Sequence, residues 1–275
     1  MDIDFTFAIC HGHSMGVPRD TKSPHIEKII ESIRSQNIKN YEILIIGDSS
    51  KINMDFNSRD TRTIQFDDSQ KSGKWLTRKK NILVQESRME NIVFIHNYVV
   101  LDSGWYDGFK KFGNNFDICV THVNNYNGSE NYTWMINPLL EDYRRKIVKN
   151  SEEFLIPKDI DSFSRFQYIP GNYWIAKKSV MVEVPLDERI MQGESEDCEW
   201  SMRAAGNFNF RLNRNSSVTF LRKDRTPRRP RLEINKEAIA SMKSLTEKES
   251  EKIISEAREK FREKFLGDAS FLDEI

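Results

Sequence analysis

Four acidic residues lie within six positions of one another in the segment GESEDCEWSMR, residues 193–203; they are Glu194, Glu196, Asp197 and Glu199. Acidic side chains at the start of a helix are stabilised by the helix dipole, which is the structural interpretation of this cluster. Trp200 and Met202 follow at once, so we expect the helix to pack inward and to hold an acid beside an apolar surface. An acid in that position can act as a general base.

Polar residues also follow three apolar segments: His11-Gly12-His13 after FTFAIC, Gly47-Asp48-Ser49 after YEILII, and His96-Asn97-Tyr98 after NIVFI. A carboxylate after a buried strand, such as Asp48, is placed where it can reach the ribose or base of a ligand. The alternative is a turn aspartate that binds its own backbone. An imidazole such as that of His96 can ligate a transition metal, whereas Asn97 and Tyr98 are poorer ligands.

Alternating strand and helix patterns supply the elements that would position these residues. The pattern predicts strands at 5–10, 41–46, 63–66 and 91–95. It also predicts a helix that begins at Pro24 after Ser23 and continues through Ile33, and a second helix at 74–87. This order predicts a largely parallel sheet covered by helices. Right-handed crossovers bring the carboxyl ends of such strands to one edge, where open α/β sheets bind ligands. We therefore expect the three polar strand ends to converge there.

The rest of the chain is less regular. We expect loops and short helices over the binding edge at 123–168, a strand at 168–177 around Gly171, and a polar helix beginning near Glu194. A basic, proline-containing linker follows at 222–232. The last forty residues are expected to be helical, with a Thr246–Glu249 capping box. Their apolar stripe consists of Ile254, Ala257, Phe261 and Phe265. We expect a binding domain over 1–222 and a basic linker with a C-terminal helical extension over 223–275.

Composition limits the class of protein. The chain has 275 residues, of which 38% are hydrophobic and 31% charged, with a formal net charge of zero. A neutral total gives no reason to expect a nucleic-acid partner. The three cysteines lie far apart, so we expect neither a disulfide framework nor a structural zinc site. No segment resembles a signal peptide or a membrane span, and we expect a cytoplasmic protein.

The order of these segments resembles that of GT-A glycosyltransferases of the family 2 type. YEILIIGDSS is similar to their second strand and acidic turn, SGKWLTRKKN to a helix with a basic Arg-Asn pattern, and IVFIHNYVVLDSGW to the strand that normally ends in a DxD metal motif. YIPGNYWIAKKSV resembles the glycine-containing strand on the acceptor side. LDERIMQGESEDCEWSMRAAG resembles the segment whose Glu-Asp motif carries the base. The resemblance covers about residues 5–222.

The resemblance implies a GT-A, Rossmann-like α/β fold with a mostly parallel central sheet flanked by helices. It implies an enzyme that transfers a sugar with inversion from a nucleotide-diphosphate sugar, most often UDP-linked, to a hydroxyl of a glycan or polysaccharide acceptor. Asp197 would be the catalytic base, and Glu196 beside it would bind hydroxyls of the donor or the acceptor. Inverting transfer needs only one such base, which deprotonates the attacking hydroxyl, and no covalent intermediate.

The resemblance also implies contacts with the donor. Asp48 would contact the nucleotide base, residues around His11 would line the nucleotide pocket, and Arg78 would lie near the base or diphosphate. His96, Asn97 and Tyr98 would face the diphosphate, and Gly171 and Asn172 would help to form the sugar and acceptor pocket. Trp174 and Trp200 could stack on sugar rings or pack in the core.

One departure from the family concerns the metal. His96 replaces the first DxD aspartate and Tyr98 the last, and Leu221 stands where the family often supplies a late histidine. Three interpretations remain open at this stage. Mn²⁺ or Mg²⁺ could be held weakly by His96 and water, basic residues such as Arg78, Arg222 or Lys223 could neutralise the diphosphate, or the chain could be a degenerate, inactive member.

Two other features allow more than one role. The basic arm at 222–232 could clamp the leaving group, touch anionic lipids at a membrane surface, or be a solvated linker. The C-terminal helix could pack on the domain, on a second copy in a homo-oligomer, or on a membrane surface. The competing functions are a non-catalytic module that binds a nucleotide sugar and a nucleotidyltransferase. HGHSMGVPRD is a poor version of the phosphate loop that a nucleotidyltransferase needs.

Overall fold

The computed structural model describes residues 2–12, 25–48, 58–69, 75–129, 131, 135–136, 167–205, 207–222 and 244–265. The strands are β1 (Phe5–Cys10), β2 (Tyr41–Gly47), β3 (Thr61–Gln65), β4 (Asn91–His96), β5 (Val99–Leu101), β6 (Ile118–Asn124), β7 (Met135–Ile136), β8 (Gln167–Tyr168), β9 (Tyr173–Lys177) and β10 (Phe210–Phe220). The helices are α1 (Ile26–Arg34), α2 (Leu76–Glu86), α3 (Trp105–Phe112), α5 (Lys178–Glu183), α6 (Glu196–Ala204) and α8 (Glu247–Phe265).

The central sheet of the described part has eight strands in the order β3-β2-β1-β4-β9-β6-β10-β5. Strands β3, β2, β1 and β4 are parallel, as their alternation with helices predicts. The sheet as a whole is mixed, because β9 runs antiparallel to both β4 and β6, and β5 runs antiparallel to β10. The α/β class is confirmed, and the antiparallel strands are the addition that the sequence did not reveal.

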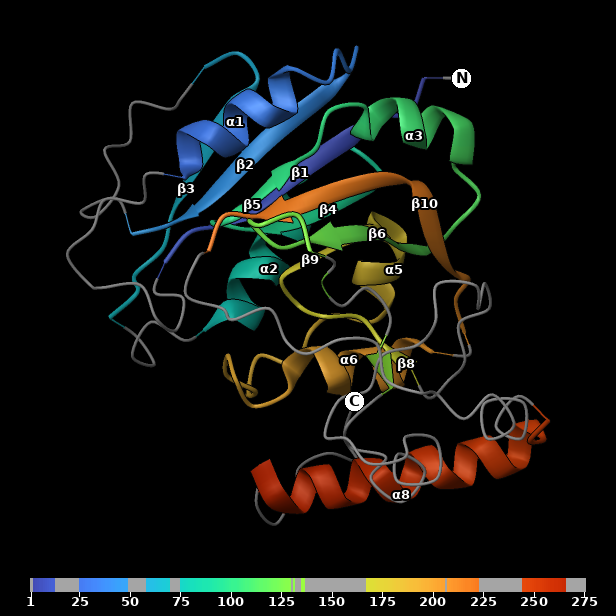
Figure 1. Ribbon diagram of the computed structural model, residues 1–275. Helices are drawn as coiled ribbons and strands as arrows, with labels where there is room; N and C mark the ends of the chain where they lie inside the picture. Colours follow the sequence, from blue (N-terminus) through green and yellow to red (C-terminus); the bar gives the residue numbers. More distant parts are fainter. Residues whose placement is uncertain are drawn as a thin grey trace.

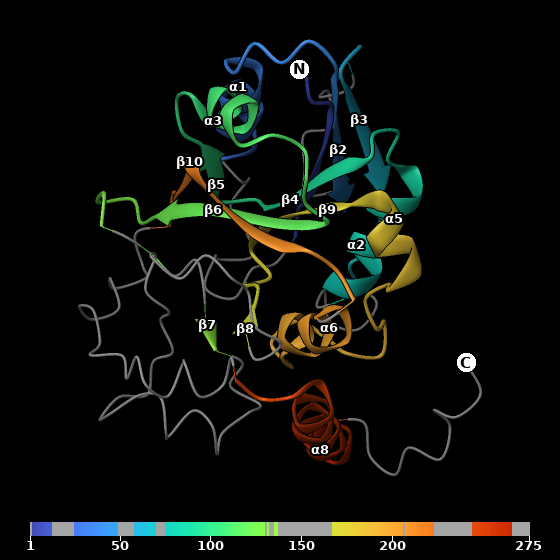
Figure 2. The ribbon, with the colours of Figure 1, turned by 90° about the vertical axis from the view of Figure 1, so that its right-hand side faces the viewer.

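Helices cover both faces of the sheet (Figures 1 and 2), because the strands bury side chains in both directions. Along β1, Phe5, Phe7 and Ile9 pack in one core with α1 and α3. Ala8 and Cys10 point to the other face and pack in a second core with residues of α2, α5 and α6. Successive side chains of a strand point to opposite faces, so a continuous apolar strand requires cover on both sides.

The predicted strand at 168–177 is interrupted. Gln167 and Tyr168 form β8, which pairs with β7, and the chain re-enters the main sheet as β9 only at Tyr173. Between the two strands, the loop around Gly171 is bonded to the end of β4 through the Asn172 carbonyl. The predicted polar helix is α6, and it begins at Glu196 after Ser195, whose φ of +66° lies in the left-handed region.

The C-terminal helix α8 packs on the domain next to α6 (Figure 2). Ile254 and Ala257 join the core cluster that also contains Trp200 of α6, and Phe261 is buried as well. The capping box is confirmed, since the Thr246 amide donates to Glu249 Oε2 at 2.8 Å and the Glu249 amide donates to Thr246 Oγ1 at 3.3 Å. Phe265 ends the helix, and its side chain lies outside the described part, as do residues 223–232 of the expected linker.

None of the helices in the described residues combines the length and the apolar character needed to cross a bilayer. The cysteines Cys10, Cys119 and Cys198 are all buried and free, in agreement with the absence of a disulfide framework expected from their spacing.

Candidate active site at the carboxyl edge of the sheet

The carboxyl ends of β1, β2 and β4 lie level with one another. Cys10 pairs with Ile46 on one side and with His96 on the other. Just beyond these pairs, the His11 amide donates to the Ile46 carbonyl at 2.9 Å, and Asn97 Nδ2 donates to the Gly12 carbonyl at 3.5 Å. The predicted convergence of the three polar strand ends is therefore confirmed. His13 and Ser49 lie outside the described residues.

The loop at Gly171 and Asn172 joins this edge to the acidic helix. The His96 amide donates to the Asn172 carbonyl at 3.0 Å, which fixes the loop against the end of β4. On the other side, the Gly171 amide donates to Asp197 Oδ2 at 2.8 Å. The Cys198 amide donates to the second oxygen, Asp197 Oδ1, at 2.9 Å. The half-buried Asp197 carboxylate is thus oriented by two backbone amides and lies next to the strand end that carries His96.

Glu196 is the more buried member of the acidic pair, with 8% of its surface exposed. Burial is the main cause that raises the pKa of its carboxyl from 4.5 to about 7, and the negative charge of Asp197 raises it further. The positive charge of Lys80 opposes this shift. Two adjacent carboxyl groups whose environments differ are typical of sites with separate acid and base roles.

Two buried lysines at this edge are functional candidates that the sequence analysis did not identify. Lys80 of α2 is 1% exposed, and its Nζ donates to the Gly171 carbonyl at 2.6 Å. Lys79 is 3% exposed, forms an ion pair with Asp68, and donates to the His11 carbonyl at 2.9 Å. Each buried ammonium therefore has oxygen partners, as burial of a charge requires.

Helical periodicity is the signal that could have identified these lysines. Leu76 and Leu83 of α2 are buried, and positions 79 and 80 lie three or four residues from each of them. Residues at that spacing share one face of a helix. The spacing of Leu76 and Leu83 therefore places both lysines on the inward face of α2, whereas their charge alone is typical of a solvated face.

Arg78 takes a different direction from its two neighbours. Its Nη1 donates to both carboxylate oxygens of Glu188 at 3.0 Å, and its side chain is 42% exposed. It therefore binds the segment that precedes α6. Asp48 follows β2 at the edge and is half-buried.

The two tryptophans pack in the core. Trp174 stacks on Phe94 with ring centroids 4.4 Å apart and lies 4.5 Å from Trp200. Both indoles are 2% exposed, so of the two interpretations, core packing is the correct one.

The residues at the position of the metal motif do not fit a divalent cation of the Mn²⁺ or Mg²⁺ type, which prefers carboxylate oxygens. Nδ1 of His96 lies 3.3 Å from the Tyr98 hydroxyl, and the Asn97 amide binds the Gly12 carbonyl. Asp102, the next acid along the chain, accepts hydrogen bonds from Ser217 and Thr219 at 2.5 and 2.7 Å.

Within the described ranges, no three His, Cys, Asp or Glu side chains come together as a metal site would require. The assignment of His96 as a metal ligand stays a prediction.

A positively charged side chain, that of Arg222, lies beside the position of the metal motif. The guanidinium of Arg222 lies over the ring of Tyr98, 5.3 Å from its centroid. The Leu221 amide donates to the Tyr98 carbonyl at 2.8 Å, so the end of β10 is held against the residues that follow β4. Leu221 itself presents no metal ligand, and the next residue supplies a positive charge.

No model of a known protein family matches this chain, and no curated protein does. Among solved structures, the chain is similar to S. aureus TarS, with 12% identity and a TM-score of 0.52 over 94% of this chain and 44% of that one. It is also similar to S. aureus TarS 1-349 in complex with UDP, with 12% identity and a TM-score of 0.50 over 96% of this chain and 72% of that one.

TarS 1-349 in complex with UDP-GlcNAc matches at 12% identity and a TM-score of 0.50, over 96% of this chain and 73% of that one. At this identity, the likeness supports the GT-A type of α/β fold and nothing finer.

Proposed function

We propose that this chain is an inverting glycosyltransferase that moves a sugar from a UDP-linked donor to a hydroxyl of a glycan or polysaccharide acceptor. The observation that best supports the proposal is the contact of Asp197 with Gly171, because the adjoining Asn172 is bonded to the end of β4. This contact brings a carboxylate to the sheet edge at which α/β folds bind nucleotides. The shared fold with TarS structures that contain UDP and UDP-GlcNAc is consistent with a UDP-linked donor.

Asp197 is proposed as the base. Its carboxylate accepts the proton of the acceptor hydroxyl while that oxygen attacks the anomeric carbon of the donor sugar. The bond from the anomeric carbon to the diphosphate breaks on the opposite face, so the configuration inverts and the nucleoside diphosphate leaves with the bonding electrons. The two backbone amides that bind Asp197 hold the carboxylate in one orientation, which general-base transfer requires.

Glu196 is proposed to bind donor or acceptor hydroxyls. With a pKa of about 7, its carboxyl group exists in both forms near neutral pH. The protonated form can donate a hydrogen bond to a sugar oxygen, and the ionised form can accept one from a sugar hydroxyl. Lys80 limits the rise of this pKa and at the same time holds the Gly171 carbonyl, so it supports the acidic pair and the loop together.

The leaving diphosphate is proposed to be neutralised by side chains of this chain. Arg222 lies beside Tyr98, at the position that faces the diphosphate in the family resemblance. Arg78 is bound to Glu188, and Lys223 lies outside the described residues. Asp48 is proposed to contact the nucleotide base, and His11 to line the nucleotide pocket.

A non-catalytic module that binds a nucleotide sugar is the second candidate. The observation that favours it is the replacement of the metal motif by His96, Asn97 and Tyr98, whose described neighbours do not complete a metal site. Such a module would bind the donor but release no nucleotide from it.

A thermal-shift screen with UDP, GDP, CDP and dTDP, each with EDTA and with Mn²⁺, tests the proposed donor class. A ligand at 100 times its Kd adds about 2.7 kcal/mol of stability. We expect a shift selective for UDP that persists in EDTA and that shrinks in Arg222→Gln, with Arg59→Gln as the exposed control. No shift with any of the four nucleotides would overturn the proposal.

A further inference from the structure

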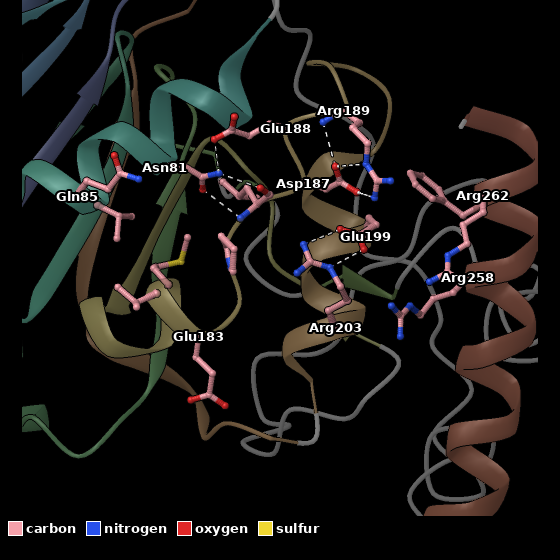
Figure 3. Close-up of a pocket in the computed structure, with 16 residues that line it drawn as sticks. Asn81, Gln85, Glu183, Asp187, Glu188, Arg189, Glu199, Arg203, Arg258 and Arg262 are labelled. Carbon is pink, nitrogen blue, oxygen red and sulfur yellow. Dashed lines mark hydrogen bonds and ion pairs between the residues drawn. The ribbon is translucent and has the colours of Figure 1, made fainter. Parts of the chain in front are cut away.

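A cavity of about 860 Å³ lies between α2, α5, α6, α8 and the segment that precedes α6 (Figure 3). Glu199 and Arg203 of α6 line it, whereas Asp197 does not. Residues of a helix are offset by about 100° each, so positions 199 and 203 face away from position 197. The cavity is therefore separate from the candidate active site.

Four arginines line this cavity together with four acids. The arginines are Arg189, Arg203, Arg258 and Arg262, and we call the cavity that they line the arginine cavity. Two of the guanidiniums are neutralised by neighbouring acids. Arg203 donates to both oxygens of Glu199 at 2.6 and 2.9 Å. Arg189 donates to Asp187 at 2.8 and 2.5 Å.

The other acids that line the cavity leave the α8 arginines unmatched. Glu188 is bound by Arg78 and Asn81, and Glu183 extends downward in Figure 3, apart from the labelled arginines.

Arg258 and Arg262 lie one helical turn apart on α8, and both side chains face α6 across the cavity (Figure 3). Both residues are half-buried, and neither makes a hydrogen bond or an ion pair within the described part of the chain. Burial lowers the pKa of Arg258; Glu199 opposes this shift, and the positive charges of Arg262 and Arg203 add to it. The cavity therefore holds two half-buried guanidiniums with which no acid of the described residues forms an ion pair.

We propose that the arginine cavity binds the phosphate group of a soluble ligand through Arg258 and Arg262. A guanidinium offers a planar fork of N–H donors that matches the oxygens of a phosphate, and charge-assisted hydrogen bonds of this kind are the strong ones. A cavity of this volume also has room for a group attached to the phosphate. The bound anion would tie α8 to the loop before α6, since the lining residues come from both.

This assignment does not depend on the proposed glycosyl transfer, because neither Glu196 nor Asp197 lines the cavity. Phosphate binding can be measured without a donor sugar, so failure of one proposal leaves the other standing.

The test is isothermal titration of the full chain with inorganic phosphate and with pyrophosphate at constant ionic strength, compared with a chloride blank. The double substitution Arg258→Gln/Arg262→Gln removes both guanidinium groups. Lys248→Gln/Lys252→Gln is the matched control, because it makes the same change in charge on exposed positions of the same helix. Two lost contacts should weaken binding at least about tenfold, since a hydrogen bond to a charged group contributes about 1.5–3 kcal/mol and about 1.4 kcal/mol is tenfold.

We expect the wild type and Lys248→Gln/Lys252→Gln to bind at least one of the two anions. Arg258→Gln/Arg262→Gln should bind that anion at least tenfold more weakly. The melting temperature of Arg258→Gln/Arg262→Gln without phosphate must stay close to that of the wild type. If it falls, Arg258→Lys/Arg262→Lys is tested instead, and it should also bind the anion more weakly than the wild type. Equal binding by Arg258→Gln/Arg262→Gln and Lys248→Gln/Lys252→Gln would overturn the proposal. So would the absence of binding heat when the wild type is titrated with either anion. Sedimentation with phosphatidylglycerol vesicles in the absence of phosphate binding would also overturn the assignment to a soluble ligand.

Discussion

The backbone amide of Gly171 donates a hydrogen bond of 2.8 Å to Oδ2 of Asp197, and this contact joins α6 to the loop that precedes β9. The same glycine accepts a hydrogen bond from Lys80 of α2 through its carbonyl. Three elements that are far apart in the sequence therefore meet at one residue. The position of the candidate base depends on the backbone at Gly171.

Replacement of Gly171 with alanine should impair transfer more than folding. The added Cβ would lie 3.2 Å from Asp197 Cβ and 3.4 Å from its Oδ2, so the carboxylate must move by a few tenths of an ångström. A misplacement of 1 Å can cost about 100-fold in rate, so we expect a loss of about tenfold in kcat.

The control for this variant is Gly128→Ala, where the φ of +79° strains the backbone but nothing lies within 4 Å of the added Cβ. It should lower the melting temperature and leave kcat unchanged. Full activity of Gly171→Ala would show that the contact with Asp197 does not position the base.

Glu196 should make the stability of the protein depend on pH. Its pKa is raised in the folded state from 4.5 to about 7, so folding favours the protonated form. The stabilising contribution is fully present below pH 4.5 and is lost as the pH rises through 7. In Glu196→Gln the side chain is neutral at every pH, so this dependence disappears.

Urea denaturation of the wild type and Glu196→Gln at pH 5 and pH 8 measures the effect. Relative to the wild type, the variant should gain about 2 to 3 kcal/mol of unfolding free energy between pH 5 and pH 8, since one pKa unit corresponds to about 1.4 kcal/mol. A difference between the two proteins that is the same at both pH values would mean that Glu196 is not buried as described.

The buried pair of Lys79 and Asp68 should be important for stability. The two side chains are 3% and 1% exposed, so removal of one partner leaves an uncompensated charge. We expect Lys79→Met to lower the free energy of unfolding by about 3–5 kcal/mol. The double substitution Asp68→Leu/Lys79→Met should recover most of that loss.

The exposed pair of Lys39 and Asp2 provides the comparison, because its side chains are 76% and 49% exposed. Lys39→Met should change stability little. If chemical denaturation gave the same loss for Lys39→Met and Lys79→Met, burial would not be the cause of the larger effect.

The parallel half of the sheet could be predicted from the sequence because its strands are continuous apolar runs. Phe5–Cys10 and Asn91–His96 bury both faces, and polar residues end each strand at the same edge. The antiparallel insertion of β9 could not be predicted in this way. Tyr173–Lys177 reads as a strand in either direction, and its orientation is fixed by pairing with Ile118 and Ile95, which are distant in sequence.

The candidate site was predictable where a residue follows a strand or opens a helix, as Asp48 and Asp197 do. The lysines of α2 carry a charge that is typical of a solvated face, but their spacing from Leu76 and Leu83 places Lys80 on the buried face. The contact between Lys80 and Gly171 joins residues 91 positions apart, so no local pattern encodes it.

The most direct test of the central claim is the release of UDP from a UDP-sugar by wild type, Asp197→Asn and Glu194→Gln. Glu194 belongs to the same acidic segment, and among the described residues its side chain binds only the Met191 amide, so it controls for loss of charge. We predict slow release by the wild type in water, faster release with an acceptor, and unchanged rates in Glu194→Gln. Asp197→Asn should be about 10²–10⁴-fold slower with donor binding retained. Release by Asp197→Asn at the wild-type rate would contradict the assignment of Asp197 as the base.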